Sequence, residues 1–327
     1  MMRTMSVDVP SDVLGADLSG VLEAAVLVEA ERVIDVRRVH AEPRGRGHGR
    51  ALVTACNTDE MSDPLWFTTT DGLQIAYDDW GSDTSRPPVV LHHGFAANAY
   101  LNWVAPGVVK ALTATGRRVV TIDARGHGRS DHPHDSDFYG ETKMATDVST
   151  LADVLGVDEF DLVGYSMGAI VSVVVASHDP RVRRMVIGGI GASVAERGGV
   201  DTRAMAPAAV QAALLADDPS TITDRSAASL RAFADSTGAD RLALAAQAAR
   251  VHRQPIELER ITVPTLVIAG RDDPVAARPQ VLADAIAGAK LTMIGGDHVG
   301  AVGTPEFAPA IVEIGRASCR ERVWLSV

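Results

Sequence analysis

Cysteines, long apolar runs and an apolar leader are all scarce or absent in this sequence. Cys56 and Cys319 are the only cysteines, so no disulfide framework is implied and a reducing compartment is compatible. The longest apolar runs, such as residues 169–176, are far shorter than the roughly 20 residues that cross a bilayer. Acidic residues interrupt the N-terminal region, namely Asp8, Asp12, Asp17, Glu23 and Glu29. We therefore expect no signal peptide and a cytoplasmic protein.

Basic residues are fewer than acidic ones, at 31 Lys and Arg against 42 Asp and Glu. The formal net charge is −11 and the sequence pI is about 5.3. Proteins that bind nucleic acid present basic surfaces to the phosphates, so a nucleic-acid partner is not expected. The chain of 327 residues is long enough for one large α/β domain with an insertion.

The sequence does contain a predicted strand that leads into Gly-x-Ser-x-Gly, within residues 161–170, followed by a predicted helix of small residues. A serine hydroxyl is a poor nucleophile unless it is exposed and held beside a base. A sharp strand-to-helix turn would expose Ser166, and Gly164 and Gly168 remove the side chains that would clash in such a turn. Ser166 would then lie at a helix N-terminus, where free N–H groups face developing negative charge.

Four other predicted strands surround this turn, and each of them ends in a motif with polar residues or glycine. These are residues 88–91 before His92-His93-Gly94-Phe95, 118–122 before Asp123 to Ser130, 263–269 before Gly270 to Pro274, and 290–294 before Gly295-Gly296-Asp297-His298. Open α/β sheets build their sites at the carboxyl ends of the strands. A serine, an acid and a histidine therefore follow one another in the chain order of the α/β-hydrolases.

In these motifs the chain resembles the α/β-hydrolase fold family, particularly its small bacterial esterase and lactonase-like members. The resemblance implies Ser166 as the nucleophile, His298 as the general base and acid, and Asp273 as the orienting carboxylate. It also implies an oxyanion hole made by the backbone N–H groups of Phe95 and Met167. Relatives that act as dehalogenases or epoxide hydrolases carry a carboxylate at the nucleophile position, so a serine there implies acyl chemistry.

Two of these motifs contain more than one candidate residue. Asp272 and Asp273 are adjacent, so their side chains point in different directions and only one can reach His298. The family spacing Gly-x-x-Asp selects Asp273 and leaves Asp272 as a turn residue. His92 and His93 are also candidate bases, but the resemblance makes them strand-end residues that shape the oxyanion loop.

Two other segments have the residue types of a metal site and of a nucleotide site. Imidazoles and carboxylates gather in one segment, at His127, Asp131, His132, His134, Asp135 and Asp137. Such residues could bind zinc, but Pro133 and the closely spaced aspartates fit a solvated loop better than a closed tetrahedral site. Residues 188–191 are glycine-rich after a strand, but Val194 stands where a dinucleotide-binding loop requires glycine. We therefore predict neither a metal nor a cofactor.

Alternating strands and helices predict an α/β fold with a mostly parallel sheet. Asp71-Gly72 predicts an N-terminal antiparallel hairpin between residues 66–70 and 73–80. Helices are predicted at residues 101–114, 141–155, 167–178, 204–215, 226–236, 239–252, 275–287 and 305–312.

The resemblance divides the hydrolase core into residues 61–192 and 258–312. It makes residues 193–257 a small helical cap that would exclude water and shape the acyl pocket. A lateral insertion away from the substrate is the alternative for the cap segment.

Both ends of the chain are predicted to lie outside this domain. Residues 1–60 have no place in the resembled fold, and a wrongly chosen upstream start codon explains them more simply than a regulatory extension does. Residues 313–323 resemble the translation of a sequencing-library adapter. The tail of residues 313–327 is therefore interpreted as an artefact, although its first apolar residues allow the last helix to continue.

The leading functional hypothesis is hydrolysis of a small carboxylic ester, or of a lactone or thioester, without a cofactor. An acyltransferase or perhydrolase would use the same triad, and a non-catalytic ligand receptor could use the same fold. Turnover of a chromogenic short-chain ester separates the enzymes from the receptor. Addition of an alcohol acceptor separates hydrolysis from acyl transfer.

Overall fold

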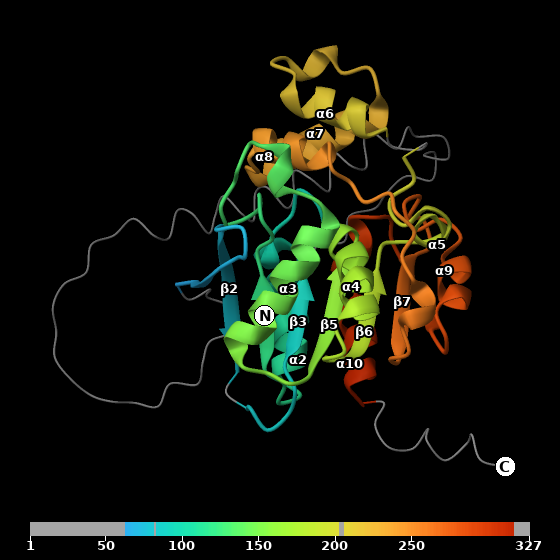
Figure 1. Cartoon of the computed structure of the whole chain (residues 1–327). Coiled ribbons are helices and arrows are strands. Elements are labelled where there is room, and N and C mark those ends of the chain that lie inside the picture. Colours follow the sequence, from blue (N-terminus) through green and yellow to red (C-terminus); the bar gives the residue numbers. More distant parts are fainter. Residues whose placement is uncertain (1–62, 82, 203–205, 317–327) are drawn as a thin grey trace, which may run out of the picture. The chain divides into compact units, whose positions relative to one another are not determined.

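A computed structural model of the chain describes residues 63–81, 83–202 and 206–316 (Figure 1). The interpretations of residues 1–60 and 317–327 therefore lie outside the described residues. Among the helices in the described part of the chain, none is long and apolar enough to cross a membrane.

The core is an eight-stranded sheet in which β1 pairs with β2, and β2 with β4, in the antiparallel direction, while the pairings of the other described strands are parallel. The strands are β1 (Leu65–Thr68), β2 (Gln74–Trp80), β3 (Val89–His92), β4 (Val119–Ile122), β5 (Phe160–Tyr165), β6 (Val182–Gly188), β7 (Thr265–Gly270) and β8 (Lys290–Ile294). Their order across the sheet is β1-β2-β4-β3-β5-β6-β7-β8. The central strands β3, β4 and β5 are buried along their whole length, as expected for parallel strands covered on both faces. The predicted α/β fold with a parallel sheet and an N-terminal antiparallel hairpin is confirmed.

Helices cover both faces of the sheet (Figure 1). On one face lie α3 (Glu141–Leu155), α4 (Met167–His178) and α9 (Pro279–Ala285), which pack through two apolar clusters. On the other face, α2 (Val108–Thr113) and α10 (Phe307–Arg316) share a third cluster. The described part of the chain also contains the short helical turns η1 (Tyr100–Val104), η2 (Ser136–Phe138), η3 (Pro219–Thr221), η4 (Leu258–Arg260) and η5 (Gly300–Gly303).

Several helix boundaries differ from those expected. The helix predicted at residues 101–114 is split into η1 and α2, because Gly107 adopts a φ of 79° that ends the first turn. Helix α9 begins at Pro279, because Arg278 before it has a left-handed φ of 50°. Helix α10 runs on to Arg316, past the boundary expected at residue 312.

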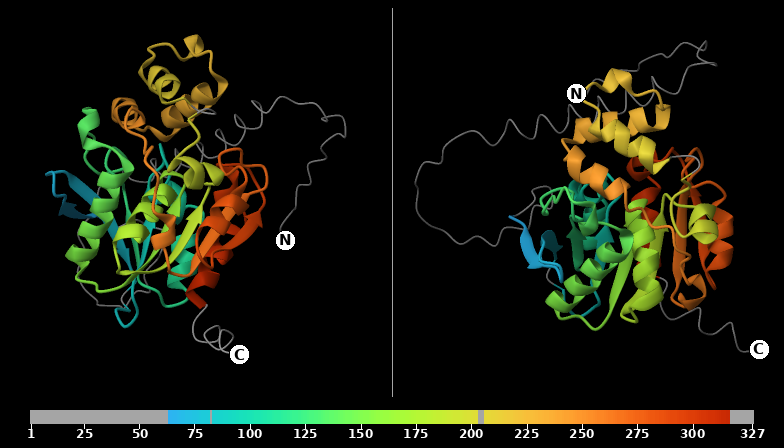
Figure 2. Two further views of the ribbon diagram at one scale, coloured as in Figure 1. Left: turned by 45° about the vertical axis from the view of Figure 1, so that its right-hand side comes forward. Right: turned by 45° about the horizontal axis from the view of Figure 1, so that its top comes forward.

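Three helices from the predicted cap segment group at the carboxyl end of the parallel strands (Figures 1 and 2). They are α6 (Pro207–Leu215), α7 (Arg225–Thr237) and α8 (Arg241–Ala248). Asp224 and Asp240 cap the second and third of these helices by accepting hydrogen bonds from first-turn N–H groups. The preceding helix α5 (Ala192–Arg197) contacts α9 instead, and its Val194 belongs to the core cluster under the sheet.

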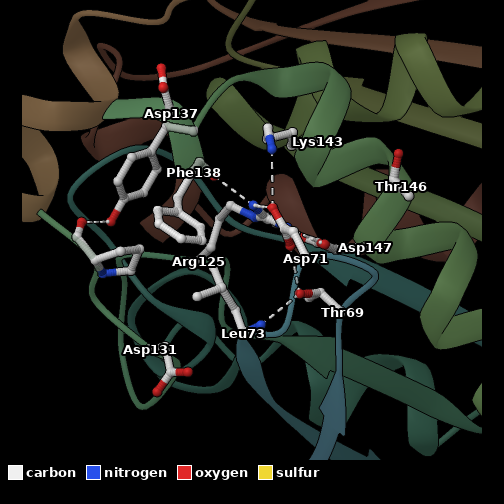
Figure 3. A network of polar contacts seen from close by, with 12 residues as sticks. Thr69, Asp71, Leu73, Arg125, Asp131, Asp137, Phe138, Lys143, Thr146 and Asp147 are labelled. Atoms are coloured by element: carbon white, nitrogen blue, oxygen red, sulfur yellow. Dashed lines mark hydrogen bonds and ion pairs between the residues drawn. The ribbon is translucent and has the colours of Figure 1, made fainter. Parts of the chain in front are cut away.

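A buried arginine joins the hairpin turn, the segment after β4 and α3 (Figure 3). Arg125 is 1% exposed, and its guanidinium bonds to both carboxylate oxygens of Asp147 at 2.7 and 2.6 Å. It also bonds to Asp71 at 2.8 and 3.0 Å and to the carbonyl of Phe138. Burial alone would lower the pKa of Arg125, but these carboxylates outweigh it and raise that pKa. Breaking such a buried network would leave an uncompensated charge, so it fixes the segment that follows β4.

Candidate active site

Ser166 lies on a strained turn between β5 and α4. Its backbone has a φ of 53° and a ψ of −114°, a conformation that residues other than glycine rarely adopt. A Cβ atom on Gly164 would lie 2.1 Å from the carbonyl oxygen of Gly168, and one on Gly168 would lie 2.1 Å from that of His92. The two glycines of the motif are therefore required by close backbone contacts on both sides of the serine.

The structure brings Ser166, His298 and Asp273 together from three separate strand ends. The Nε2 atom of His298 is 2.9 Å from Oγ of Ser166. Its Nδ1 atom is 2.9 Å from Oδ2 and 3.1 Å from Oδ1 of Asp273. Because a carboxylate only accepts hydrogen bonds, Nδ1 carries the proton, which leaves Nε2 free to accept from the serine hydroxyl. The imidazole is partly open to solvent, at 27% side-chain exposure, whereas the Asp273 side chain is fully enclosed.

Asp273 and Asp272 have opposite environments, although they are adjacent. Oδ1 of Asp273 accepts hydrogen bonds from the N–H groups of Val275 and Ala276, which fix the carboxylate beside His298. Asp272 is exposed. Of the two carboxylates, the structure therefore brings Asp273 to the imidazole, as the family spacing predicts.

The loop that follows β3 lies directly against Ser166. A Cβ atom on Gly94 would lie 3.4 Å from Cβ of Ser166 and 3.5 Å from Oδ1 of Asn102. That Asn102 oxygen accepts the Gly94 N–H at 2.8 Å. Phe95 comes after the end of β3, so its N–H is outside the sheet ladder. Met167 begins α4, so its N–H is among the first-turn amides that have no acceptor within the helix.

Two buried histidines hold the peptide groups on either side of Phe95. The Nδ1–H of His93 donates to the carbonyl of Gly94 at 2.8 Å, and its Nε2 accepts from the N–H of Ala124 at 2.9 Å. In a trans peptide the C=O and N–H point in opposite directions. Binding of the Gly94 carbonyl by His93 therefore turns the Phe95 N–H to the other side.

His127 acts on the next peptide group in the same way. Its Nε2 accepts from the N–H of Ala96 at 3.1 Å, and its Nδ1–H donates to the carbonyl of Arg125 at 3.0 Å. Ala96 has a φ of 59°, so this contact stabilises an unfavourable backbone conformation. Burial lowers the pKa of His127 to about 4 and that of His93 well below its usual value, so both rings are neutral at neutral pH.

The histidines and carboxylates that follow β4 serve separate purposes. His127 is in the core, Asp131 accepts the Gln74 N–H at 2.7 Å, and His134 contacts Asp240 at 2.9 Å. Asp137 forms an ion pair with Arg250. Within residues 63–81, 83–202 and 206–316, no three His, Cys, Asp or Glu side chains are grouped so that they could hold a metal ion.

Tyr165 is a residue of the site that the sequence analysis did not single out. Its hydroxyl donates to the backbone carbonyl of His298 at 2.7 Å, and its ring lies 5.6 Å from the imidazole. Both contacts position the loop that carries His298. The signal that the sequence offered was the position of Tyr165 at the end of the strand, directly before the serine.

Comparisons with known proteins agree with this fold. A model of the alpha/beta hydrolase fold matches residues 87–208. The sn-1-specific diacylglycerol lipase ABHD11 of Xenopus laevis is 35% identical over 116 residues, which cover 35% of this chain and 35% of the relative. The bifunctional esterase/perhydrolase DCH of Acinetobacter calcoaceticus is 38% identical over 106 residues, which cover 32% of this chain and 35% of the relative. The chain thus aligns with only about a third of the length of these curated relatives.

A solved structure extends the similarity over the whole domain. The structure of a hydrolase from Pseudomonas aeruginosa PA01 matches with a TM-score of 0.65 at 29% sequence identity, over 79% of this chain and 100% of that chain. The order of the strands, the matched family model and this structural likeness together show that the chain has the α/β-hydrolase fold and is similar to hydrolases that share it.

Proposed function

We propose that the protein is a serine hydrolase that cleaves a small carboxylic ester, lactone or thioester through an acyl-enzyme. The observation that carries the proposal is the continuous contact from Ser166 Oγ to His298 Nε2 and from His298 Nδ1 to Asp273, each at 2.9 Å. These three groups supply a nucleophile, a base and an orienting carboxylate.

In the proposed reaction, Ser166 Oγ attacks the acyl carbon while His298 Nε2 removes the hydroxyl proton. The carbonyl oxygen becomes negative and accepts hydrogen bonds from the N–H groups of Phe95 and Met167. His298 then returns the proton to the leaving alcohol, and the acyl group remains on Ser166. Water, activated by the same imidazole, releases the acid and restores the serine. Asp273 stabilises the imidazolium in both halves of the reaction.

The surroundings of the site support preorganisation of these groups. His93 and His127 fix the peptide groups beside Phe95, and Tyr165 fixes the loop of His298. Such a site does not have to reorganise when charge develops, which is the main advantage that an enzyme has over water. The cytoplasmic location and the absence of a cofactor requirement stay predictions that belong to this proposal.

A graded panel of p-nitrophenyl esters and simple lactones tests the proposal. We expect the wild-type protein to turn over the short-chain members and Ser166→Ala to lose that turnover while it stays folded. The site is a turn that holds a small polar side chain, so the substitution removes little packing. Near wild-type turnover in the purified variant would reject Ser166 as the nucleophile.

Acyl transfer is the second candidate, because a relative at 38% identity is named a bifunctional esterase/perhydrolase. The same acyl-enzyme would then be attacked by an alcohol or by hydrogen peroxide instead of water. Addition of methanol or peroxide to the ester assay separates the two outcomes. A methyl ester or peracid product in place of the free acid would favour transfer, and unchanged formation of the acid would favour hydrolysis.

A further inference from the structure

We propose that Gln247, on cap helix α8, is a specificity-determining residue that accepts a hydrogen bond from the substrate. The preferred substrate is then an ester that carries a hydroxyl or amide N–H group close to its scissile carbonyl. This inference rests on the proposed function and adds a substrate class to it.

Helix α8 packs onto both segments that would form the oxyanion hole. Its residues Ala243 and Ala246 belong to the same apolar cluster as Met167. Two further residues of the helix, Ala245 and Ala248, belong to a second cluster with Ala96. Phe95 packs against both clusters. Helix α8 therefore packs with Met167, which follows the nucleophile, and with the loop that carries Phe95.

Gln247 is the only polar residue on this buried face. The buried residues of α8 are Ala243, Leu244, Ala245, Ala246, Gln247 and Ala248. The glutamine side chain is 5% exposed, which is unusual for a residue that carries a primary amide. A helix that only had to cover an apolar core would need no amide at this position.

The amide group lies directly beside the residue that follows the nucleophile. Its Nε2 atom is 2.7 Å from Sδ of Met167, the next residue after Ser166. A thioether sulfur is a weak hydrogen-bond acceptor, so this contact satisfies the amide poorly. The contact does place the amide at the nucleophile turn, and there a substrate bound to Ser166 would be within its reach.

The carbonyl oxygen of the same amide differs from its nitrogen in its contacts. Oε1 of Gln247 is buried, and no hydrogen bond to it is found among the residues that the structure describes. A buried acceptor without a donor destabilises the folded protein, because the oxygen has lost its water and gained nothing. A ligand that brings a donor to this oxygen would remove the penalty.

Another glutamine of the cap has a structural role. Gln211 on α6 is half-buried, and its Nε2 donates to the backbone carbonyl of Ala245 at 3.3 Å. That contact ties α6 to α8. The Gln247 amide instead contacts the thioether of Met167 at the start of α4 through Nε2, and its Oε1 has no partner among the described residues, so that oxygen is left for a ligand.

The chemistry of the free atom defines the ligand. A carbonyl oxygen accepts and does not donate, so it selects a substrate with an O–H or N–H group. A plain alkyl ester would leave the oxygen unpaired in the closed site. Sites built around a polar group discriminate strongly against analogues that lack the matching group.

Two matched pairs of esters test the proposal and separate the two possible positions of the donor. The acyl pair is p-nitrophenyl butyrate and p-nitrophenyl β-hydroxybutyrate. The alcohol pair is propyl butyrate and hydroxyethyl butyrate, followed by acid release. In the wild-type protein we expect a preference of at least about tenfold in kcat/KM for the hydroxylated member of one pair.

We expect Gln247→Leu and Gln247→Met to reduce that ratio to about one, whereas the control Gln211→Leu leaves it unchanged. The two Gln247 variants should unfold at no lower a temperature than the wild-type protein, because an apolar side chain replaces an unsatisfied one. If Gln247 had a purely structural role, the two substitutions would change the unfolding temperature and leave the kcat/KM ratio unchanged.

Three results would overturn the proposal. One is a kcat/KM ratio near one for both ester pairs in the wild-type protein. This result does not depend on the folding of any variant. Another is a wild-type preference that both Gln247 variants keep. If the wild-type protein cleaved none of the four esters and no member of the wider ester panel, the proposed function would fail and this inference with it. Cleavage without discrimination would reject the inference alone.

Discussion

Nδ1 of His298 lies 2.9 Å from Oδ2 of Asp273, and that carboxylate is enclosed by the turn that follows β7. The carboxylate keeps the imidazole proton on Nδ1, so Nε2 faces Ser166 as an acceptor. We therefore expect Asp273→Asn to lower kcat by as much as about 10⁴-fold, because an amide would favour the wrong tautomer. The matched control is Asp272→Asn, a change of the adjacent exposed carboxylate, for which we expect near wild-type kcat. The reverse ranking of the two variants would make Asp272 the triad acid.

His93 offers a test of the oxyanion loop that does not touch the triad. Its Nδ1–H binds the Gly94 carbonyl and thereby directs the Phe95 N–H. We expect His93→Leu to lower kcat by about 10²-fold with little change in KM, since loss of one oxyanion donor costs about 10²–10³ in turnover.

His92→Leu is the control for this experiment. His92 is equally buried, but its ring contacts the carbonyl of His93 and not that of Gly94. Near-ultraviolet circular dichroism checks the packing of both variants. Equal losses of kcat in the two variants would show a general packing defect and would contradict the specific role of His93.

Much of this site could be predicted from the sequence, because strand ends in a parallel sheet meet at one edge. The predicted positions of Ser166, Asp273 and His298 lie within hydrogen-bond distance of one another in the structure. The fold class followed from the alternation of strands and helices and is confirmed. The roles of these residues in a reaction stay predictions until activity is measured.

The contacts that support the site could not be predicted in the same way. Tyr165, His127 and Gln247 act through partners that are 31 to 133 positions away in the chain, and no local pattern specifies such pairings. Helix boundaries such as the start of α9 depend on a single residue in the left-handed conformation, Arg278. Arginine has no preference for that conformation, so the sequence does not indicate it.

Glu141 gives the protein a pH-dependent stability at the junction of cap and core. Its carboxylate accepts the backbone N–H of His252, in the segment that returns from the cap. Burial raises the pKa of Glu141 from 4.5 to about 7, although that hydrogen bond opposes the shift. The unfolded chain therefore releases this proton at lower pH than the folded protein does. The contribution of the Glu141 carboxyl group to the free energy of unfolding is therefore fully present below about pH 4.5 and is lost as the pH rises through about 7.

Comparison of the wild-type protein with Glu141→Gln isolates this effect from other titrations. We expect the free energy of unfolding of the wild-type protein, relative to that of Glu141→Gln, to fall by up to about 3 kcal/mol between pH 4.5 and 7.5. Denaturant unfolding at several pH values measures it, and Glu159→Gln provides an exposed control. A difference between wild type and Glu141→Gln that does not vary with pH would contradict the assignment.

The fragment of residues 61–312 is expected to fold and to cleave the same esters as the full chain. The strands β1 to β8, the cap helices and the candidate catalytic residues lie within it. Helix α10 continues to Arg316, so the shorter fragment ends inside it and the fragment 61–316 is the matched comparison. We expect the longer fragment to unfold at the same or a slightly higher temperature. Loss of both folding and activity in the two fragments would show that a removed end belongs to the domain.

Covalent trapping of the nucleophile tests the central claim most directly. A fluorophosphonate ester reacts with an activated serine and leaves a stable adduct that peptide mass spectrometry can locate. We predict one adduct, on Ser166, which Ser166→Ala abolishes and His298→Ala greatly slows, because the imidazole must remove the hydroxyl proton. An adduct on another residue, or an unmodified Ser166 in a protein that still cleaves esters, would contradict the account.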